Sequence, residues 1–240
     1  MIVKTNAIVL STIKYGEHDL IIKCYTKEYG VVSFLQKGIL KAKKGKVKKA
    51  YFQLLSQLQL EITYQENRSL QYIKEVKPYV IYTTLHNDIF KSTIVMFLSE
   101  VLSTSLQEEE ENESLYVYLE TTLQWLDIQD SCANFHLLFL LKLTKHLGFY
   151  PEQHKSDFSS FNLKGGRFEN KPTDFYSITG ENLTLLKQLL GTVFDNLTAV
   201  KINATQRQAF LAMLLYYYDL HLGTFKKPKS LEIFNQVFNT

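Results

Sequence analysis

Residues 57–64 read QLQLEITY, a stretch in which polar and apolar side chains alternate without interruption. A β-strand turns successive side chains to opposite faces, so this alternation predicts a strand with one face in a core and the other in water. The first eighty residues hold four other strand-like segments: 5–14, 20–26, 31–36 and 69–76. Five short strands so close together are typical of a small antiparallel barrel or sandwich.

The periodicity changes after Pro78, where we place a domain boundary. Apolar residues then recur at helical spacing in the segments 81–106, 115–126, 135–147, 181–190, 205–222 and 230–238. Gly165 and Gly166 predict a hairpin turn inside the polar segment 150–178. The pattern indicates an α+β protein, with a five-stranded β domain at residues 1–79 and a helical domain at residues 80–240.

The composition is that of a globular protein, with 45% hydrophobic and 13% aromatic residues among 240. Cys24 and Cys132 lie far apart and form no CxxC pair, so we expect two buried thiols in a reducing compartment. The first residues lack the apolar run of a secretory signal, and no segment approaches the ~18–20 apolar residues that span a bilayer. We therefore expect a cytoplasmic protein.

The charges are divided unevenly along the chain, although the net charge is only +3. Residues 1–80 carry 14 Lys and Arg against 6 Asp and Glu, whereas residues 81–240 carry 13 against 18. Seven lysines and no acid stand in the segment 37–50, KGILKAKKGKVKKA, between two predicted strands. Such an imbalance points to a polyanionic partner.

A lysine-rich loop on a small barrel predicts binding to nucleic acid. Lysine contacts phosphates as a point charge and does not read bases, so binding should be independent of sequence. The alternative is a solvated loop whose lysines only keep the protein in solution. Tyr15, beside Gly16 in a turn, is the aromatic side chain that we expect to be exposed and able to stack on a base. The candidate DNA-binding residues are Lys14, Tyr15, Lys37, Lys41, Lys43, Lys44, Lys46, Lys48, Lys49 and Arg68.

No catalytic or cofactor-binding motif is present. The chain contains no GxxxxGK[ST], HExxH or GxSxG sequence. Cys132 and His136 are four residues apart, but no acid or amide is placed in the sequence to orient them, and a buried structural thiol is the better interpretation. We expect a protein that is not an enzyme and that needs neither cofactor nor metal.

The order of several segments resembles the RecO family of bacterial recombination-mediator proteins. These segments are AIVLSTIKYGEHD (7–19), LIIKCYT (20–26), the Lys37-Gly38 pair, FQLLSQLQLEITY (52–64), RSLQYIKE (68–75), LGFYP (147–151), FNLKGGRF (161–168), LHLG (220–223) and KSLE (229–232). Together they span essentially the whole chain.

The resemblance implies an N-terminal OB-fold, a helical domain, and a role in recombinational DNA repair in the cytoplasm, in association with the nucleoid. The family binds single- and double-stranded DNA and anneals complementary strands. With RecR, it helps load RecA onto DNA coated by single-strand binding protein, whose acidic C-terminal tail it also contacts. Lys37 and Lys41 match basic positions of the family's OB-fold surface, and Lys142 and Lys145 are candidates for contacting the tail.

The chain departs from the family in one respect. Many members carry four zinc-binding cysteines after the LGxxP segment, but residues 152–178 contain no cysteine here. The hairpin around FNLKGGRF must therefore be held by ordinary packing. Two other functions stay open: an RNA-binding OB module, since lysine does not sense the 2′-hydroxyl, and a protein–protein scaffold without affinity for nucleic acid.

Overall fold

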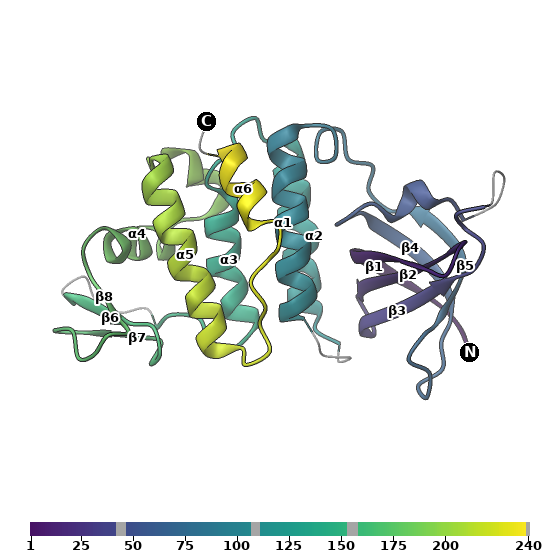
Figure 1. The fold of residues 1–240 in the computed structure, drawn as a ribbon, viewed down its shortest axis with the longest axis horizontal. Helices are drawn as coiled ribbons and strands as arrows, with labels where there is room; N and C mark the ends of the chain where they lie inside the picture. Colours follow the sequence, from purple (N-terminus) through teal and green to yellow (C-terminus); the bar gives the residue numbers. More distant parts are fainter. Residues whose placement is uncertain (42–46, 107–110, 153–157, 239–240) are drawn as a thin grey trace. The chain divides into compact units, whose positions relative to one another are not determined.

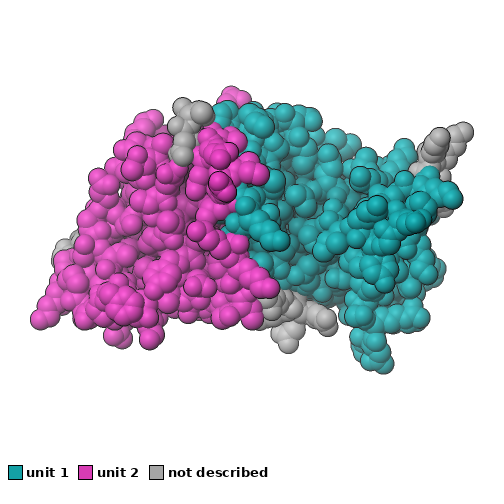
Figure 2. Space-filling model, viewed as in Figure 1, with its two compact units in different colours: residues 1–128, 228–230 teal, residues 129–227, 231–240 magenta. Residues whose placement is uncertain are grey.

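The computed structural model describes residues 1–41, 47–106, 111–152 and 158–238, and these divide into two compact units (Figures 1 and 2). Unit 1 comprises residues 1–128 with 228–230, and unit 2 comprises residues 129–227 with 231–240. This division differs from the boundary that we place after residue 79, which stays a prediction.

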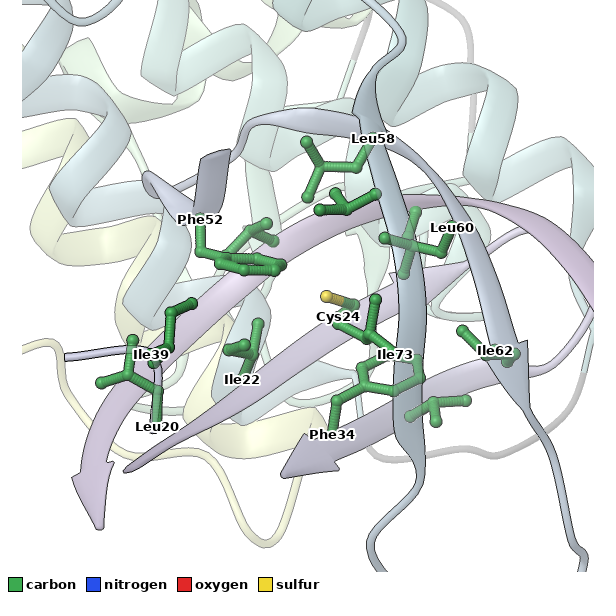
Figure 3. Packing of buried hydrophobic residues seen from close by; sticks show 14 residues of the cluster. Leu20, Ile22, Cys24, Phe34, Ile39, Phe52, Leu58, Leu60, Ile62 and Ile73 are labelled. Carbon is green, nitrogen blue, oxygen red and sulfur yellow. The ribbon is translucent and has the colours of Figure 1, made fainter. Parts of the chain in front are cut away.

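Five antiparallel strands form the sheet of unit 1: β1 (Ile2–Tyr15), β2 (Asp19–Thr26), β3 (Gly30–Gln36), β4 (Gln57–Thr63) and β5 (Tyr72–Pro78). Their order is β3-β2-β1-β4-β5, and a short 3₁₀ helix, η1 (Lys49–Phe52), precedes β4. The alternation of residues 57–64 is confirmed, because Leu58, Leu60 and Ile62 all lie in the core (Figure 3). The predicted five-stranded arrangement is therefore correct.

In the described residues, an isolated bridge joins the two edges of the sheet. Phe34 of β3 and Gln71, just before β5, form an isolated parallel bridge. The amide of Leu35 donates to the Gln71 carbonyl at 2.9 Å, and the amide of Gln71 donates to the Ser33 carbonyl at 2.8 Å. The sheet is thus the partly open form of the OB-fold rather than a closed barrel.

Two helices complete unit 1: α1 (Ile89–Ser105) and α2 (Glu113–Ile128). The prediction of a helix from residue 81 was wrong for its first turns. Asp88 caps α1 by accepting a hydrogen bond from the Lys91 amide at 2.9 Å. The preceding amides of Thr83, Thr84 and Leu85 donate to the carboxylate of Asp127, and the helix begins only at Ile89.

These helices cover part of the outer face of the sheet. The Lys23 ammonium on β2 donates to the Ser103 carbonyl at 2.8 Å, and the amide of the Gln57 side chain donates to the Glu120 carbonyl at 2.8 Å. The Tyr25 ring stacks on Tyr116 with centroids 6.3 Å apart. The covered part of the sheet is therefore the half near the end of β2.

Unit 2 contains α3 (Phe135–His146), α4 (Gly180–Leu190), η2 (Phe194–Ala199), α5 (Ala204–His221) and α6 (Leu231–Phe238). Three short strands, β6 (Ser160–Asn162), β7 (Arg167–Glu169) and β8 (Ser177–Ile178), form a second sheet in the order β7-β6-β8. The predicted hairpin is confirmed, since β6 and β7 pair antiparallel across the two glycines.

Packing and hydrogen bonds hold this hairpin. Phe161 is buried and contacts Phe168 and Tyr217, with centroids 4.9 and 5.8 Å apart. The Asn162 side chain accepts a hydrogen bond from the Gly165 amide at 2.8 Å. His221 on α5 is hydrogen-bonded to the Leu163 carbonyl at 2.8 Å, which attaches the hairpin to the helix.

Candidate nucleic-acid interface

Several of the predicted site residues lie at the end of the sheet where β1 and β3 end and β2 begins. Tyr15 at the end of β1 pairs with Asp19 at the start of β2, and Leu20 pairs with both Lys14 and Gln36. Lys37 follows directly after Gln36. The register therefore brings Lys37, which is distant in sequence, to the same end of the sheet as Lys14 and Tyr15. We call this the β1–β3 end.

The lysine-rich connection is attached to this end by its first residues. The Asp19 carboxylate accepts a hydrogen bond from the Gly38 amide at 2.7 Å, and the His18 carbonyl accepts one from the Leu40 amide at 3.0 Å. Gly38 has φ +68°, a left-handed conformation that glycine adopts without strain. Ile39 then inserts into the core of the sheet. Lys37 and Lys41 are consequently held in place on either side of this anchor.

The lysines of this region point into solvent. Lys14, Lys37, Lys41, Lys48 and Lys49 are all exposed, and in the described part of the chain none of them is within salt-bridge distance of a carboxylate. Lys43, Lys44 and Lys46 lie outside the described residues. Ammonium groups without an ion-pair partner, such as those of Lys14, Lys37 and Lys41 at the β1–β3 end, produce a positive surface potential that attracts phosphates.

Tyr15 is 54% exposed, as predicted, whereas Tyr25, Phe34 and Phe52 are buried. One exposed apolar residue beside it was missed: Ile13 is 61% exposed. Ala7 and Val9 lie in the core, and continued alternation along β1 would place Ile13 there as well. A bulge between Val9 and Ser11 reverses the alternation. No local sequence signal marks this bulge.

Arg68 lies apart from the other candidates. It belongs to the connection between β4 and β5, which begins at Tyr64 beside Met1, at the opposite end of β1 from Tyr15. Its guanidinium carbon is 5.8 Å from the ring centroid of Tyr72, and both residues are exposed. Arg68 is therefore a separate positively charged residue and does not belong to the β1–β3 end.

The candidates in unit 2 have different environments. The Lys142 ammonium donates to the Leu190 carbonyl at 3.0 Å and to the Tyr150 hydroxyl at 3.2 Å, so two of its three donors already have partners. Lys145 is exposed in the last turn of α3.

Sequence reasoning missed a pocket of 560 Å³ at the start of α5, lined by Asn134, Lys201, Asn203 and Arg207 among others. Arg207 is fixed there by donating to the Asn134 side chain at 3.1 Å and to the Ile202 carbonyl at 3.2 Å. The only local signal was the capping box formed by Asn203 and Gln206, which marks the helix start but not a pocket.

The fold and its surface define the class: an OB-fold protein with a lysine-rich end and a helical second part. Residues 1–82 match the family described as Recombination protein O N terminal, and residues 86–232 match Recombination protein O C terminal. The chain belongs to the RecO family of DNA repair proteins, as the resemblance had indicated.

Relatives named DNA repair protein RecO match over their full length. The chain is 47% identical to that of Christiangramia forsetii over 99% of its own length, and 46% identical to that of Flavobacterium johnsoniae over 100%. The relative from Bacteroides fragilis is 36% identical, again over 100% of both chains. Within the described residues, no helix is both long and apolar enough to span a membrane.

Proposed function

We propose that this protein is a non-catalytic mediator of recombinational repair that binds single- and double-stranded DNA without sequence preference and anneals complementary strands. With RecR, it would help load RecA onto DNA coated by single-strand binding protein. Two findings support this proposal: membership of the RecO family and the exposed lysines of the β1–β3 end.

The observation that carries the proposal is the anchor between Asp19 and Gly38. It holds the start of the lysine-rich connection against the β1–β2 turn, so that Lys14, Lys37 and Lys41 present their charges together. Each ammonium that contacts a phosphate releases a condensed counterion, which favours binding regardless of base sequence. Positive charge between two strands also screens their mutual repulsion, and this allows complementary bases to meet.

Charge reversal tests this proposal. The test variant replaces three lysines of the β1–β3 end by Glu: Lys14, Lys37 and Lys41. A matched control with the same change in net charge replaces three other exposed lysines by Glu: Lys4, Lys74 and Lys77. Fluorescence anisotropy with single- and double-stranded oligonucleotides should show a loss of affinity of ~100-fold or more for the first variant. Equal affinities for the two variants would contradict a role of the β1–β3 end.

Function is tested by annealing of complementary oligonucleotides that are first coated with single-strand binding protein. The first variant should anneal slowly and the control at the native rate. Parallel titration of DNA and RNA oligomers of the same sequence distinguishes a DNA mediator from an RNA-binding module. A native protein without affinity for either polymer at low salt would instead be a protein–protein scaffold.

The pocket at the start of α5 is the site that we propose for the acidic tail of single-strand binding protein. Lys201 and Arg207 provide positive charge there, and the N-terminus of α5 adds a partial positive charge. The Lys201→Glu variant should bind a fluorescent tail peptide ~10-fold more weakly, whereas Lys145→Glu should bind it normally. Weaker binding by Lys145→Glu, with normal binding by Lys201→Glu, would instead place the tail site at the end of α3.

A further inference from the structure

Unit 2 exposes a row of aromatic side chains that no part of the proposed function uses. Phe175 and Tyr176 have ring centroids 3.9 Å apart, and Tyr176 stacks on Tyr216 of α5 at 6.4 Å with an interplanar angle of 19°. Phe175 is 81% exposed and Tyr216 is 41% exposed. Exposed aromatic rings at adjacent positions are typical of a ligand-binding or partner-binding surface.

Positive charges flank this row. The Lys164 ammonium lies over the ring of Tyr176, 5.3 Å from its centroid. On the other side, Tyr216 also lines a groove of 290 Å³ together with Leu215, Asp219, Phe225 and Lys227. Lys226 and Lys227 are both exposed. Lys164 therefore lies beside the aromatic row at Tyr176, and Lys227 lies beside the groove that adjoins the row at Tyr216.

The aromatic row is built on a rigid support. The Tyr176 carbonyl accepts a hydrogen bond from the Leu163 amide at 3.1 Å, and its amide donates to Asp174 at 2.9 Å. The bond between Leu163 and His221 then ties the same hairpin to α5, the helix that carries Tyr216. The stacking of Tyr176, which precedes β8, on Tyr216 is thus fixed by the hydrogen bonds that join the Tyr176 backbone to the hairpin and the hairpin to α5.

We propose that the row Phe175–Tyr176–Tyr216, with its adjoining groove, is a second contact for single-stranded DNA, separate from the β1–β3 end. Unpaired bases stack on the rings, and one base enters the groove beside Tyr216. The phosphates on either side contact Lys164 and Lys227. That the bound polymer is DNA rests on the proposed function, whereas the preference for unpaired strands rests on the exposed rings of this surface.

Three features favour an unpaired strand over other occupants. Aromatic rings interleaved with lysines suit a chain of flat bases joined by phosphates. A duplex keeps the faces of its bases stacked on one another and cannot offer them to Tyr176 and Tyr216. Asp219 at the groove would repel a phosphate or an acidic peptide, but its carboxylate can accept hydrogen bonds from an exocyclic amino group, as on cytosine.

The test compares full-length variants in which the rings are removed or retained. Tyr176→Ala with Tyr216→Ala should bind single-stranded oligonucleotides roughly tenfold more weakly or worse, because stacking on two rings is lost. Its affinity for duplex DNA should stay unchanged. Tyr176→Phe with Tyr216→Phe keeps both rings and should bind like the native protein. Tyr79→Ala, which removes an exposed ring outside unit 2, is the control.

A direct readout does not depend on the folding of variants. Ultraviolet crosslinking of the native protein to an oligonucleotide that contains 5-iodouracil should yield adducts at Tyr176 or Tyr216, identified by mass spectrometry. The same adducts should form in the variant with Lys14, Lys37 and Lys41 changed to Glu, at a higher protein concentration. Failure of the proposed function would appear as undiminished duplex binding by that lysine variant, a result independent of the adducts.

Three outcomes would overturn this inference. The first is native affinity for single strands in the alanine variant, with no adduct at either tyrosine in the native protein. The second is an equal loss for single-stranded and duplex DNA, since a stacking surface must distinguish them. Loss of binding to a peptide or protein partner, with DNA binding intact, would show that the aromatic row is a protein-docking surface instead.

Discussion

The Asp19 carboxylate and the Gly38 amide are 2.7 Å apart, so an acid lies at the centre of the most basic region of the chain. Coulomb's law alone predicts that removing this acid strengthens binding to DNA. The anchor predicts the opposite, because Asp19→Ala frees the start of the lysine-rich connection. We expect Asp19→Ala to bind DNA several-fold more weakly despite its higher positive charge.

Asp19→Asn separates the two effects. The amide side chain keeps an oxygen that can accept from Gly38, and it removes the negative charge. Its affinity for DNA, measured by anisotropy at the same salt concentration, should equal or exceed the native value. If both variants bind more tightly than the native protein, charge alone governs the surface and the anchor has no role in binding.

Salt dependence reports how many phosphates are contacted. If about six phosphates are neutralised, log K should fall with log salt at a slope of about −5, which is a loss of about 10³ between 50 and 200 mM. The variant with Lys14, Lys37 and Lys41 changed to Glu should have a slope smaller by roughly 3. A steep slope that this variant leaves unaltered would place the phosphate contacts elsewhere on the protein.

The Asp127 carboxylate organises the chain between the sheet and α1. It accepts hydrogen bonds from three successive backbone amides, at Thr83, Thr84 and Leu85, and the buried Lys91 ammonium donates to its main-chain carbonyl at 2.8 Å. Burial by itself would raise the pKa of Asp127, but these hydrogen bonds outweigh it and lower the pKa below its ordinary value.

Replacing Asp127 by Ala should therefore destabilise the protein strongly, because three amides lose their acceptor. We expect about 3 kcal/mol less free energy of unfolding in urea titrations. Asp130→Ala, which removes an exposed acid three residues further on, should cost less than about 0.5 kcal/mol. Similar unfolding midpoints for the two variants would show that water replaces the lost acceptor.

His136 makes the stability of unit 2 depend on pH. Its ring is buried between α3 and α6, 4.6 Å from the centroid of Phe234 and 5.9 Å from that of Phe238. Burial, with a smaller contribution from the charge of Arg207, lowers the pKa of His136 to about 3. An unfolded histidine has a pKa near 6.5. Between these two values the unfolded chain binds one proton that the folded chain does not.

Stability contributed by the neutral ring is thus complete above pH 6.5 and falls as the pH is lowered toward 3. The loss should reach about 2 kcal/mol at pH 5, at about 1.4 kcal/mol per pH unit. The His136→Leu variant should lose less stability between pH 7 and pH 5 in thermal melts. An unchanged pH dependence in that variant would assign the effect to other groups.

Much of the fold could be predicted because its signals are local. The alternation of residues 57–64 marks β4, and the glycine pair at 165–166 marks the turn between β6 and β7. The late start of α1 could not be predicted, because it depends on Asp127, about forty residues further along the chain. The exposure of Ile13 was hidden for a similar reason, since a bulge leaves no residue pattern of its own.

Composition and side-chain periodicity were sufficient to identify a β part, a helical part and a lysine-rich connection, since each of these is encoded in neighbouring residues. They could not tell which lysines act together. That depends on the register of β1, β2 and β3, which aligns Lys14 and Tyr15 with Lys37, and on one carboxylate that holds Gly38 beside them. The stacking of Tyr176 on Tyr216 depends likewise on folding, because forty residues separate the two rings and packing of the hairpin on α5 brings them together.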